Sequence, residues 1–379
     1  MFTSKLPDQQ TTIFTVMSAM ANKYGALNLS QGFPDFPSDP VLIELVSKAM
    51  QDGYNQYAPM PGFIGLREAL CNKYQLLYER KYHPETEVTI TAGATQALFT
   101  AFGALVQAGD EVIIFAPAYD SYEPAVKLFG GVPVILQMPA PAYTPDWEAV
   151  SQAITARTKL VVINSPNNPS GTIWSEADML QLQKLVEAHD LYVISDEVYE
   201  HLVFDGKQHQ SVAKFDGLAR RSFIMGSFGK TFHNTGWKMG HCMAPEPLME
   251  EFKKVHQFNV FAVNHPVQRA LATYMQDTNK YLSLPDFYQA KRDRLLAGIA
   301  GSRFSFSPAA GTYFQLLDYS QINDQHDTDF AAYLTKEKGL ATIPTSVFNK
   351  DQADDKRLRV CFAKTEQTLD QAIALINSI

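Results

Sequence analysis

Residues 159–169 read KLVVINSPNNP, an apolar run followed at once by asparagine, serine and proline. Residues 160–163 are all apolar and leave no polar face, which is typical of a strand buried on both sides in a parallel sheet. The polar residues behind the run are typical of a turn. Ligands of open parallel sheets bind beyond the carboxyl ends of the strands, so residues 164–169 are expected to lie beside a functional site.

Similar β-rich runs alternate with helical patterns through the middle of the chain. This alternation predicts an α/β fold with a mostly parallel sheet covered by helices on both faces. Helices are also expected before the sheet, the first after the Ser38-Asp39-Pro40 start signal. The expected strands are 87–91, 111–115, 132–137, 159–163, 191–195 and 222–225, and the expected early helices are 41–51 and about 65–80.

After about residue 285 the pattern changes to that of a smaller α+β domain. Its expected elements are a long amphipathic helix at 286–299, strands at 303–307 and 312–317, a helix, a strand at 357–362 and a last helix. The polar, proline-rich N-terminal segment has no expected strand, and we expect it to pack with this domain. The predicted division is therefore 1–39, 40–284 and 285–379, with the ligand in the cleft between the two domains.

Composition narrows the classes of function. The 379 residues are 46% hydrophobic and 19% charged, which is enough for large packed cores. A net charge of −8 without long blocks of like charge argues against nucleic-acid and anionic-membrane partners. Cys71, Cys242 and Cys361 are too scattered for a disulfide framework. No apolar run is long enough for a membrane span or a secretory signal, so we expect a cytoplasmic protein.

Three familiar sites are disfavoured by their spacing. Gly229-Lys230-Thr231 imitates the end of a P-loop, but Ile224 stands where the first glycine should be. The sequence has no GxGxxG and no HExxH, which argues against a nicotinamide dehydrogenase and a catalytic metal.

The turn Gly93-Ala94-Thr95, after an expected strand, opens a helix whose backbone N–H groups suit an anion such as a phosphate.

Asn168, Asp196 and Lys230 each follow a different expected strand. Charged side chains at the ends of central strands are costly to bury without partners. A lysine in an enclosed site can form a Schiff base, and a carboxylate beside a pyridine nitrogen keeps that nitrogen protonated. These are the two groups that pyridoxal phosphate needs to act as an electron sink.

The stretch 227–240, SFGKTFHNTGWKMG, resembles the cofactor-lysine signature of the class I aminotransferases, the fold type I enzymes that depend on pyridoxal phosphate. Residues 30–36 and 55–59 resemble the branch that contains kynurenine, glutamine-phenylpyruvate and bacterial methionine aminotransferases. The likeness extends over essentially the whole chain. It implies a large domain with a sheet of the seven-stranded type and a small domain made from both chain ends.

The resemblance also implies roles for single residues around the cofactor. Lys230 is expected to bind the cofactor and then shuttle a proton, Asp196 to pair with the ring nitrogen, and Asn168 and Tyr199 with the phenolic oxygen. Tyr119 is expected to stack on the ring. Lys230, Asp196 and Tyr199 are the implied catalytic residues. The implied cofactor contacts are Gly93, Ala94, Thr95, Tyr119, Asn168, Asp196, Tyr199, Ser227, Lys230 and Lys238, with Tyr57 reaching across from the second subunit of a homodimer.

Arg359 is implied as the ligand of the substrate α-carboxylate, assisted by Asn168 and the backbone of Gly32. An arginine holds a planar carboxylate through two parallel hydrogen bonds and so orients the α-C–H bond, which a lysine cannot do. Arg357 shares a strand face with Arg359 by period two, so the residues alone leave the choice open and the resemblance favours Arg359. Lys238 departs from the wider class, where arginine is common, but fits this branch.

Several aromatic residues belong to segments that the resemblance places near the cleft, namely Phe14, Tyr57, Tyr119, Phe261 and Tyr313. We expect Phe14 to contact substrate. No second arginine suits a side-chain carboxylate, so the expected amino donor is uncharged, with methionine and phenylalanine first.

These inferences predict a ping-pong transaminase that takes an amino acid and a 2-oxo acid, with no metal, no nucleic acid and no membrane partner. A carbon–sulfur β-lyase acting on cysteine conjugates is the main alternative, because the same carbanion can eliminate a thiol. A cofactor-binding regulator without turnover is a further alternative.

Overall fold

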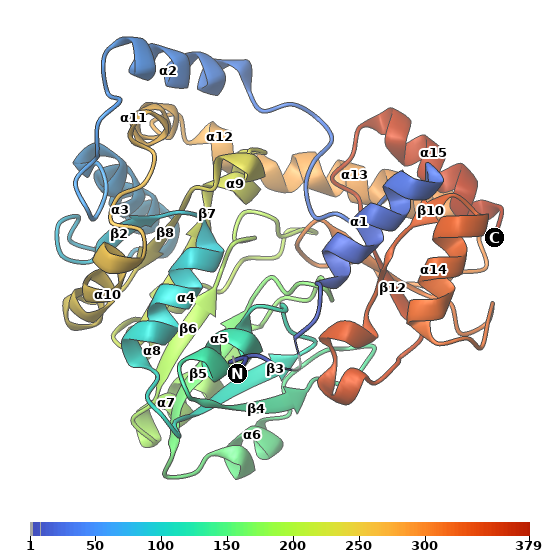
Figure 1. Ribbon diagram of the computed structural model, residues 1–379, viewed down its shortest axis with the longest axis horizontal. Coiled ribbons are helices and arrows are strands. Elements are labelled where there is room, and N and C mark those ends of the chain that lie inside the picture. Colours follow the sequence, from blue (N-terminus) through green and yellow to red (C-terminus); the bar gives the residue numbers. More distant parts are fainter. Residues whose placement is uncertain (1–2, 8) are drawn as a thin grey trace.

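The computed structural model describes residues 3–7 and 9–379, and its largest element is a seven-stranded sheet (Figure 1). The strands lie in the order β2-β8-β7-β6-β5-β3-β4. Neighbours are parallel except that β8 is antiparallel to β2 and to β7. This arrangement confirms the predicted fold class. The strands are β2 (Val88–Thr91), β3 (Glu111–Ala116), β4 (Val132–Gln137), β5 (Thr158–Asn164), β6 (Tyr192–Asp196), β7 (Ser222–Ser227) and β8 (Gly240–Met243).

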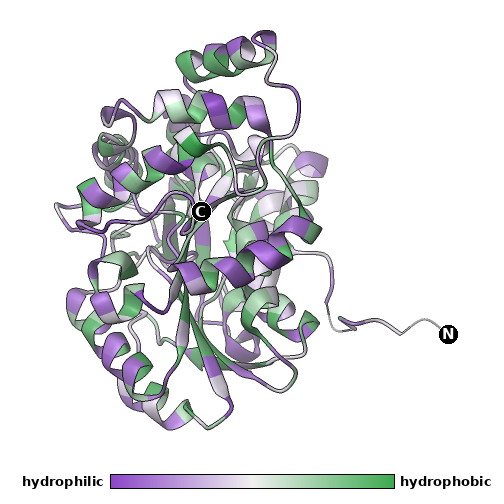
Figure 2. Ribbon diagram, turned by 90° about the vertical axis from the view of Figure 1, so that its left-hand side faces the viewer, coloured by the Kyte–Doolittle hydropathy of each residue, from purple (hydrophilic) through white to green (hydrophobic). Residues whose placement is uncertain are grey.

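Helices cover both faces of this sheet. In β5, Val161 and Ile163 belong to one hydrophobic cluster, and Leu160 and Val162 belong to a second. The alternation follows from the two-residue period of a strand. Figure 2 shows hydrophobic residues along the central strands and many hydrophilic ones on the outer helices. The helices between residues 40 and 283, not all of which touch the sheet, are α2 (Pro40–Gln51), α3 (Ile64–Tyr78), α4 (Ala94–Leu105), α5 (Tyr122–Leu128), α6 (Trp147–Ala153), α7 (Glu176–Ala188), α8 (Asp216–Ala219), α9 (Phe228–Thr231), α10 (Glu246–Asn259), α11 (His265–Tyr274) and α12 (Asn279–Leu282).

The sequence analysis did not predict β8. Its residues are Gly240, His241, Cys242 and Met243, which form no β-rich run. The register places Gly226 of β7 opposite His241, and a Cβ on Gly226 would lie 2.1 Å from the His241 ring. The pairing of β7 with β8 therefore depends on a close approach that the pattern of apolar residues does not reveal.

A second group of elements lies beside the large sheet, on the right of Figure 1. It contains a three-stranded antiparallel sheet in the order β11-β12-β9. The expected strand at 303–307 is wrong, because only an isolated bridge joins Ser305 to Asp318. The elements are α13 (Leu284–Ile299), β9 (Phe314–Asp318), α14 (Asp327–Glu337), β10 (Leu340–Ala341), β11 (Ile343–Pro344), β12 (Arg357–Cys361) and α15 (Glu366–Asn377).

The N-terminal segment has a sheet position, contrary to our expectation. After α1 (Ile13–Tyr24), strand β1 (Leu27–Asn28) pairs in parallel with β10, with Leu27 opposite Leu340. A two-residue strand is too short to show a period, and its partner is near the other end of the chain. Residues 1, 2 and 8 of this segment lie outside the described residues. The boundaries at 39/40 and 284/285 stay a prediction.

The buried carboxylate of Glu197 fixes the turn that follows β6 through hydrogen bonds. Glu197 accepts hydrogen bonds from Ser195 Oγ at 2.7 Å and from the backbone N–H of Val212 at 3.1 Å. Its other oxygen lies 2.8 Å from Nε2 of His209. These contacts hold the backbone on both sides of Asp196, the last residue of β6.

Among residues 3–7 and 9–379, every helix is too short or too polar to cross a membrane.

Candidate active site

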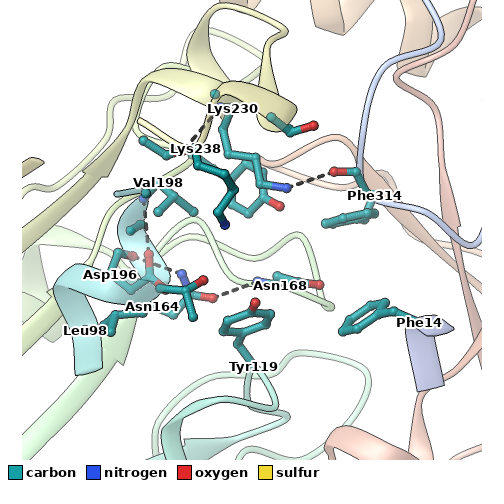
Figure 3. A pocket seen from close by; sticks show the side chains of 18 of the residues that line it. Phe14, Leu98, Tyr119, Asn164, Asn168, Asp196, Val198, Lys230, Lys238 and Phe314 are labelled. Atoms are coloured by element: carbon teal, nitrogen blue, oxygen red, sulfur yellow. Dashed lines mark hydrogen bonds between the residues drawn. The ribbon is translucent and has the colours of Figure 1, made fainter. Parts of the chain in front are cut away.

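A cavity of about 300 Å³ opens at the carboxyl ends of β5, β6 and β7, on the side that faces β9 and β12. Figure 3 shows side chains from several elements pointing into it. The predicted residues that line it are Phe14, Gly32, Gly93, Ala94, Thr95, Tyr119, Asn168, Asp196, Tyr199, Ser227, Lys230, Lys238 and Arg359. The fold thus brings together every predicted site residue except Tyr57.

Asp196 ends β6 with its carboxylate at the cavity wall. Its Oδ2 accepts a hydrogen bond from the hydroxyl of Tyr122 at 2.5 Å. Its Oδ1 accepts one from the backbone N–H of Val198 at 3.3 Å (Figure 3). Burial raises the pKa of Asp196 to about 6, and the hydrogen bond from Tyr122 opposes that rise. The site therefore holds a buried carboxylate whose charge depends on its neighbours.

Lys230 projects from the short helix α9 at the opposite side of the cavity (Figure 3). Its Nζ donates to the carbonyl oxygen of Gly32 at 2.8 Å and to the hydroxyl of Tyr313 at 2.9 Å. Burial lowers the pKa of Lys230 to about 8. A substantial fraction of the amine is then neutral near that pH, and a neutral amine is nucleophilic.

The N-terminus of α4 lies at one end of the cavity. Gly93 precedes the helix with φ +82°, and a Cβ there would lie 3.4 Å from Nζ of Lys238. Ala94 and Thr95 begin the helix, where backbone N–H groups have no partner within the helix. Ser227 and the ammonium of Lys238 line the same cavity. Donors, a helix dipole and a cation together suit a phosphate.

Arg359 of β12 lies across the cavity and is fully buried. Its Nη1 donates to Oδ1 of Asn168 at 2.7 Å, and its Nη2 donates to the carbonyl of Ser30 at 2.7 Å. Nε has no hydrogen-bond partner among the residues that the structure describes. The guanidinium lies 3.8 Å from the ring centroid of Phe314. A buried cation with a free donor and an aromatic face is suited to a planar carboxylate.

The structure distinguishes Arg357 from Arg359, between which the sequence alone did not decide. Nη2 of Arg357 lies 3.1 Å from Asp318, and its Nη1 lies 3.3 Å from Asp355. Arg357 does not line the cavity described above, whereas Arg359 does. Two acids thus occupy the guanidinium of Arg357, so the position of Arg359 supports its assignment.

The aromatic residues divide into two groups. Phe14 and Tyr119 line the cavity, and Tyr313 contacts Lys230. Tyr57 lies on the surface with 80% of its area exposed, and its ring packs edge-on against Phe261 at 5.4 Å between centroids. The expectation that Tyr57 reaches a second subunit therefore stays a prediction.

Sequence reasoning missed Tyr122, gave Asn164 no role of its own, and expected Tyr313 near the cleft without predicting its hydrogen bond with Lys230. Asn164 ends β5 and donates from Nδ2 to the carbonyl of Asp196 at 2.9 Å, so the rule that strand ends carry ligands could have identified it. Tyr122 begins α5, and Tyr313 precedes β9. No local signal predicts the contacts of these two hydroxyls, because their partners, Asp196 and Lys230, are far away in the chain.

Comparison with known proteins places the chain in a family. The family model for aminotransferase class I and II matches residues 24–376, so the chain belongs to that family. It is a transaminase that acts on amino acids, as its relatives agree.

Three relatives show the extent of the likeness. Methionine aminotransferase of Escherichia coli K12 is 47% identical over 367 residues, which is 97% of this chain and 95% of that protein. Kynurenine–oxoglutarate transaminase 1 of Rattus norvegicus is 34% identical and covers 92% of this chain and 91% of its own. A crystal structure from Escherichia coli with a methionine aminotransferase function has a TM-score of 0.97 and 46% identity, and covers 100% of both chains. These relatives confirm the predicted enzyme class and give the carbon–sulfur lyase alternative no support.

Proposed function

We propose that the chain is a pyridoxal-phosphate-dependent aminotransferase that moves the amino group of methionine or an aromatic amino acid to a 2-oxo acid by a ping-pong mechanism. One observation carries this proposal. A single cavity contains the carboxylate of Asp196, the amine of Lys230, an anion-binding helix terminus and the guanidinium of Arg359. The names of the relatives given above support the same substrate class.

The donor set of the cavity fits pyridoxal phosphate. Lys238, Ser227 and the start of α4 would hold the phosphate, and Asp196 would meet the ring nitrogen at the other end. Asn168 and Tyr199 would meet the phenolic oxygen, Tyr119 the ring face, and Lys230 the aldehyde carbon. When bound, the cofactor supplies an electron sink for negative charge at the substrate α-carbon.

The chain itself supplies orientation and proton transfer. Arg359 binds the α-carboxylate of the substrate through two parallel hydrogen bonds and so presents the α-C–H bond to the amine of Lys230. That amine takes the proton as a general base and returns it as a general acid, for which a pKa of about 8 is well matched to neutral solution. Phe14 and Phe314, which line the cavity, exclude water from the charged groups.

The charges of the cavity favour an uncharged amino donor. Among the lining residues that the structure describes, Arg359 is the one arginine, and Lys230 and Lys238 have other roles in this proposal. A second carboxylate on the substrate would then have no fork-shaped partner, whereas the aromatic rings of Phe14 and Phe314 offer apolar contact.

The defining experiment follows product in each half of the reaction. With loaded enzyme, methionine alone should yield about one equivalent of its oxo acid per site and then stop, and adding a second 2-oxo acid should restore turnover. We expect kcat/KM for methionine or phenylalanine to exceed that for aspartate by about tenfold or more. Aspartate as the best donor would contradict the substrate class. Continuous pyruvate release from a cysteine conjugate without any oxo acid would contradict the reaction.

We also propose a homodimer with shared active sites, which rests on exposed aromatic side chains. The rings of Tyr57 and Phe261 meet edge-on and are 80% and 47% exposed, and Phe258, three residues before Phe261 in the chain, is 87% exposed. Such a patch on a monomer is typical of a protein interface. Phe258→Glu should convert a species of twice the chain mass into one of the single mass in sedimentation, and should weaken cofactor binding.

The matched control for the dimer is Leu180→Glu, which places the same charge at another apolar side chain, 50% exposed on α7. It should leave the sedimentation coefficient unchanged. A wild-type protein that sediments as a monomer while it transaminates would overturn the dimer.

We further propose a cytoplasmic location, consistent with the unbridged thiols of Cys242 and Cys361. Recovery of native protein from the culture medium would contradict it.

A further inference from the structure

Among the residues that the structure describes, Tyr122 forms the shortest hydrogen bond to the carboxylate of Asp196. Its hydroxyl lies 2.5 Å from Oδ2 of Asp196, and the two residues are only 2% and 4% exposed. The other carboxylate oxygen receives the longer bond from Val198. No lysine or arginine of the described chain forms an ion pair with Asp196. The phenol is therefore the main donor to this buried acid within the protein.

We propose that Tyr122 is a positioning residue for Asp196. The Tyr122 hydroxyl keeps the Asp196 carboxylate ionised and aligned toward the cavity, so that the ring nitrogen of a bound cofactor stays protonated. The inference rests on the proposed function, because it concerns how Asp196 acts on pyridoxal phosphate.

The physical reason is the cost of a buried charge. A carboxylate removed from water needs strong donors, and a hydrogen bond to a charged group is stronger than one between neutral groups. Burial raises the pKa of Tyr122 well above its ordinary value, so the phenol keeps its proton and remains a donor. Removing the hydroxyl makes the carboxylate more basic. The proton that the acid and the ring nitrogen share then moves toward Asp196.

The location of Tyr122 links this acid to a second part of the site. Tyr122 follows Tyr119 by three residues, and its backbone N–H donates to the carbonyl of Tyr119 at 3.3 Å. Their rings meet edge-on with centroids 5.8 Å apart. The turn that leads into α5 therefore places one aromatic ring at the cavity face and the next behind the carboxylate. The turn at residues 119–122 therefore positions both Tyr119, expected at the face of the cofactor ring, and the Asp196 carboxylate, expected at its nitrogen.

Tyr122→Phe tests this inference, because it removes one oxygen and keeps the buried ring. We would load wild type and variant with pyridoxal phosphate labelled with ¹⁵N in the ring and record the nitrogen chemical shift. Wild type should show a protonated ring nitrogen at neutral pH. The variant should show a shift toward the unprotonated value, and its dissociation constant for the cofactor should rise about tenfold. kcat should fall more than KM rises.

Tyr143→Phe is the matched control. The Tyr143 hydroxyl also donates to a carboxylate, that of Asp355, but Tyr143 does not line the cavity described above. This variant should keep the wild-type nitrogen shift and cofactor affinity. A Tyr122→Phe variant that binds the cofactor with unchanged nitrogen shift and affinity would overturn the inference alone. A wild-type protein that does not bind the cofactor would overturn the proposed function instead.

Discussion

Replacing Lys230 with alanine is expected to lower kcat with methionine by about 10⁴-fold or more. The amine is the group that the geometry offers for proton transfer at the α-carbon, and general acid–base groups contribute about 10²–10⁴-fold on their own. Loss of the covalent link to the cofactor adds to this effect. Single-turnover formation of the oxo acid, measured with the variant saturated in pyridoxal phosphate, checks the expectation.

Lys238→Ala is the contrasting variant, because it removes a cation from the same cavity without touching the reacting amine. It should weaken cofactor affinity while retaining much of kcat at saturating cofactor. When pyridoxal phosphate is added to the cofactor-free wild type, imine formation should become faster as pH increases through about 8, since the neutral amine is the nucleophile, and borohydride reduction should then leave the label on residue 230. A Lys230→Ala enzyme with kcat near that of wild type would refute the role of this lysine.

Replacing Arg359 with lysine is expected to lower kcat/KM for methionine by about 10²–10³-fold. The ammonium keeps the positive charge but loses the second parallel hydrogen bond, and a bond to a charged group contributes about 1.5–3 kcal/mol. The poorer orientation of the α-C–H bond adds a further loss. Steady-state kinetics with methionine at saturating oxo acid provide the measurement, and circular dichroism shows whether the variant is folded.

Arg357→Lys is the matched control for Arg359→Lys, since the two residues lie on the same strand. Arg357 is engaged by Asp318 and Asp355 and does not line the cavity. Its replacement should change kcat/KM by less than about threefold, as expected for a residue outside the site, while it lowers the melting temperature slightly. Equal kinetic losses in both variants would show that Arg359 acts through stability rather than through substrate.

The strand ends of the site were predictable from local pattern. Asp196 and Ser227 end β6 and β7, and both follow short apolar runs that stand out in the sequence. Parallel strands bring their carboxyl ends to one edge, so locating the runs also locates these side chains. The turn at Gly93 was visible for the same reason, because it joins a strand to a helix.

Other features could not be read from local pattern. The pairing of Leu27 with Leu340 joins the two ends of the chain, and a two-residue strand carries no period. The contact of Tyr122 with Asp196, like that of Tyr313 with Lys230, joins residues that are distant in sequence. Their geometry depends on register and packing, which local propensity does not specify.

The order of apolar runs and turns was enough to indicate an α/β sheet with lysine, aspartate and asparagine at one edge, because strand period and chain direction are local properties. The residues that shift the pKa values of these groups come into contact with them only in the folded structure. Burial, the hydrogen bond from Tyr122 to Asp196 and the pairing of Arg357 with Asp318 arise where distant segments meet. Electrostatic effects depend on such distances in space rather than on position in the chain.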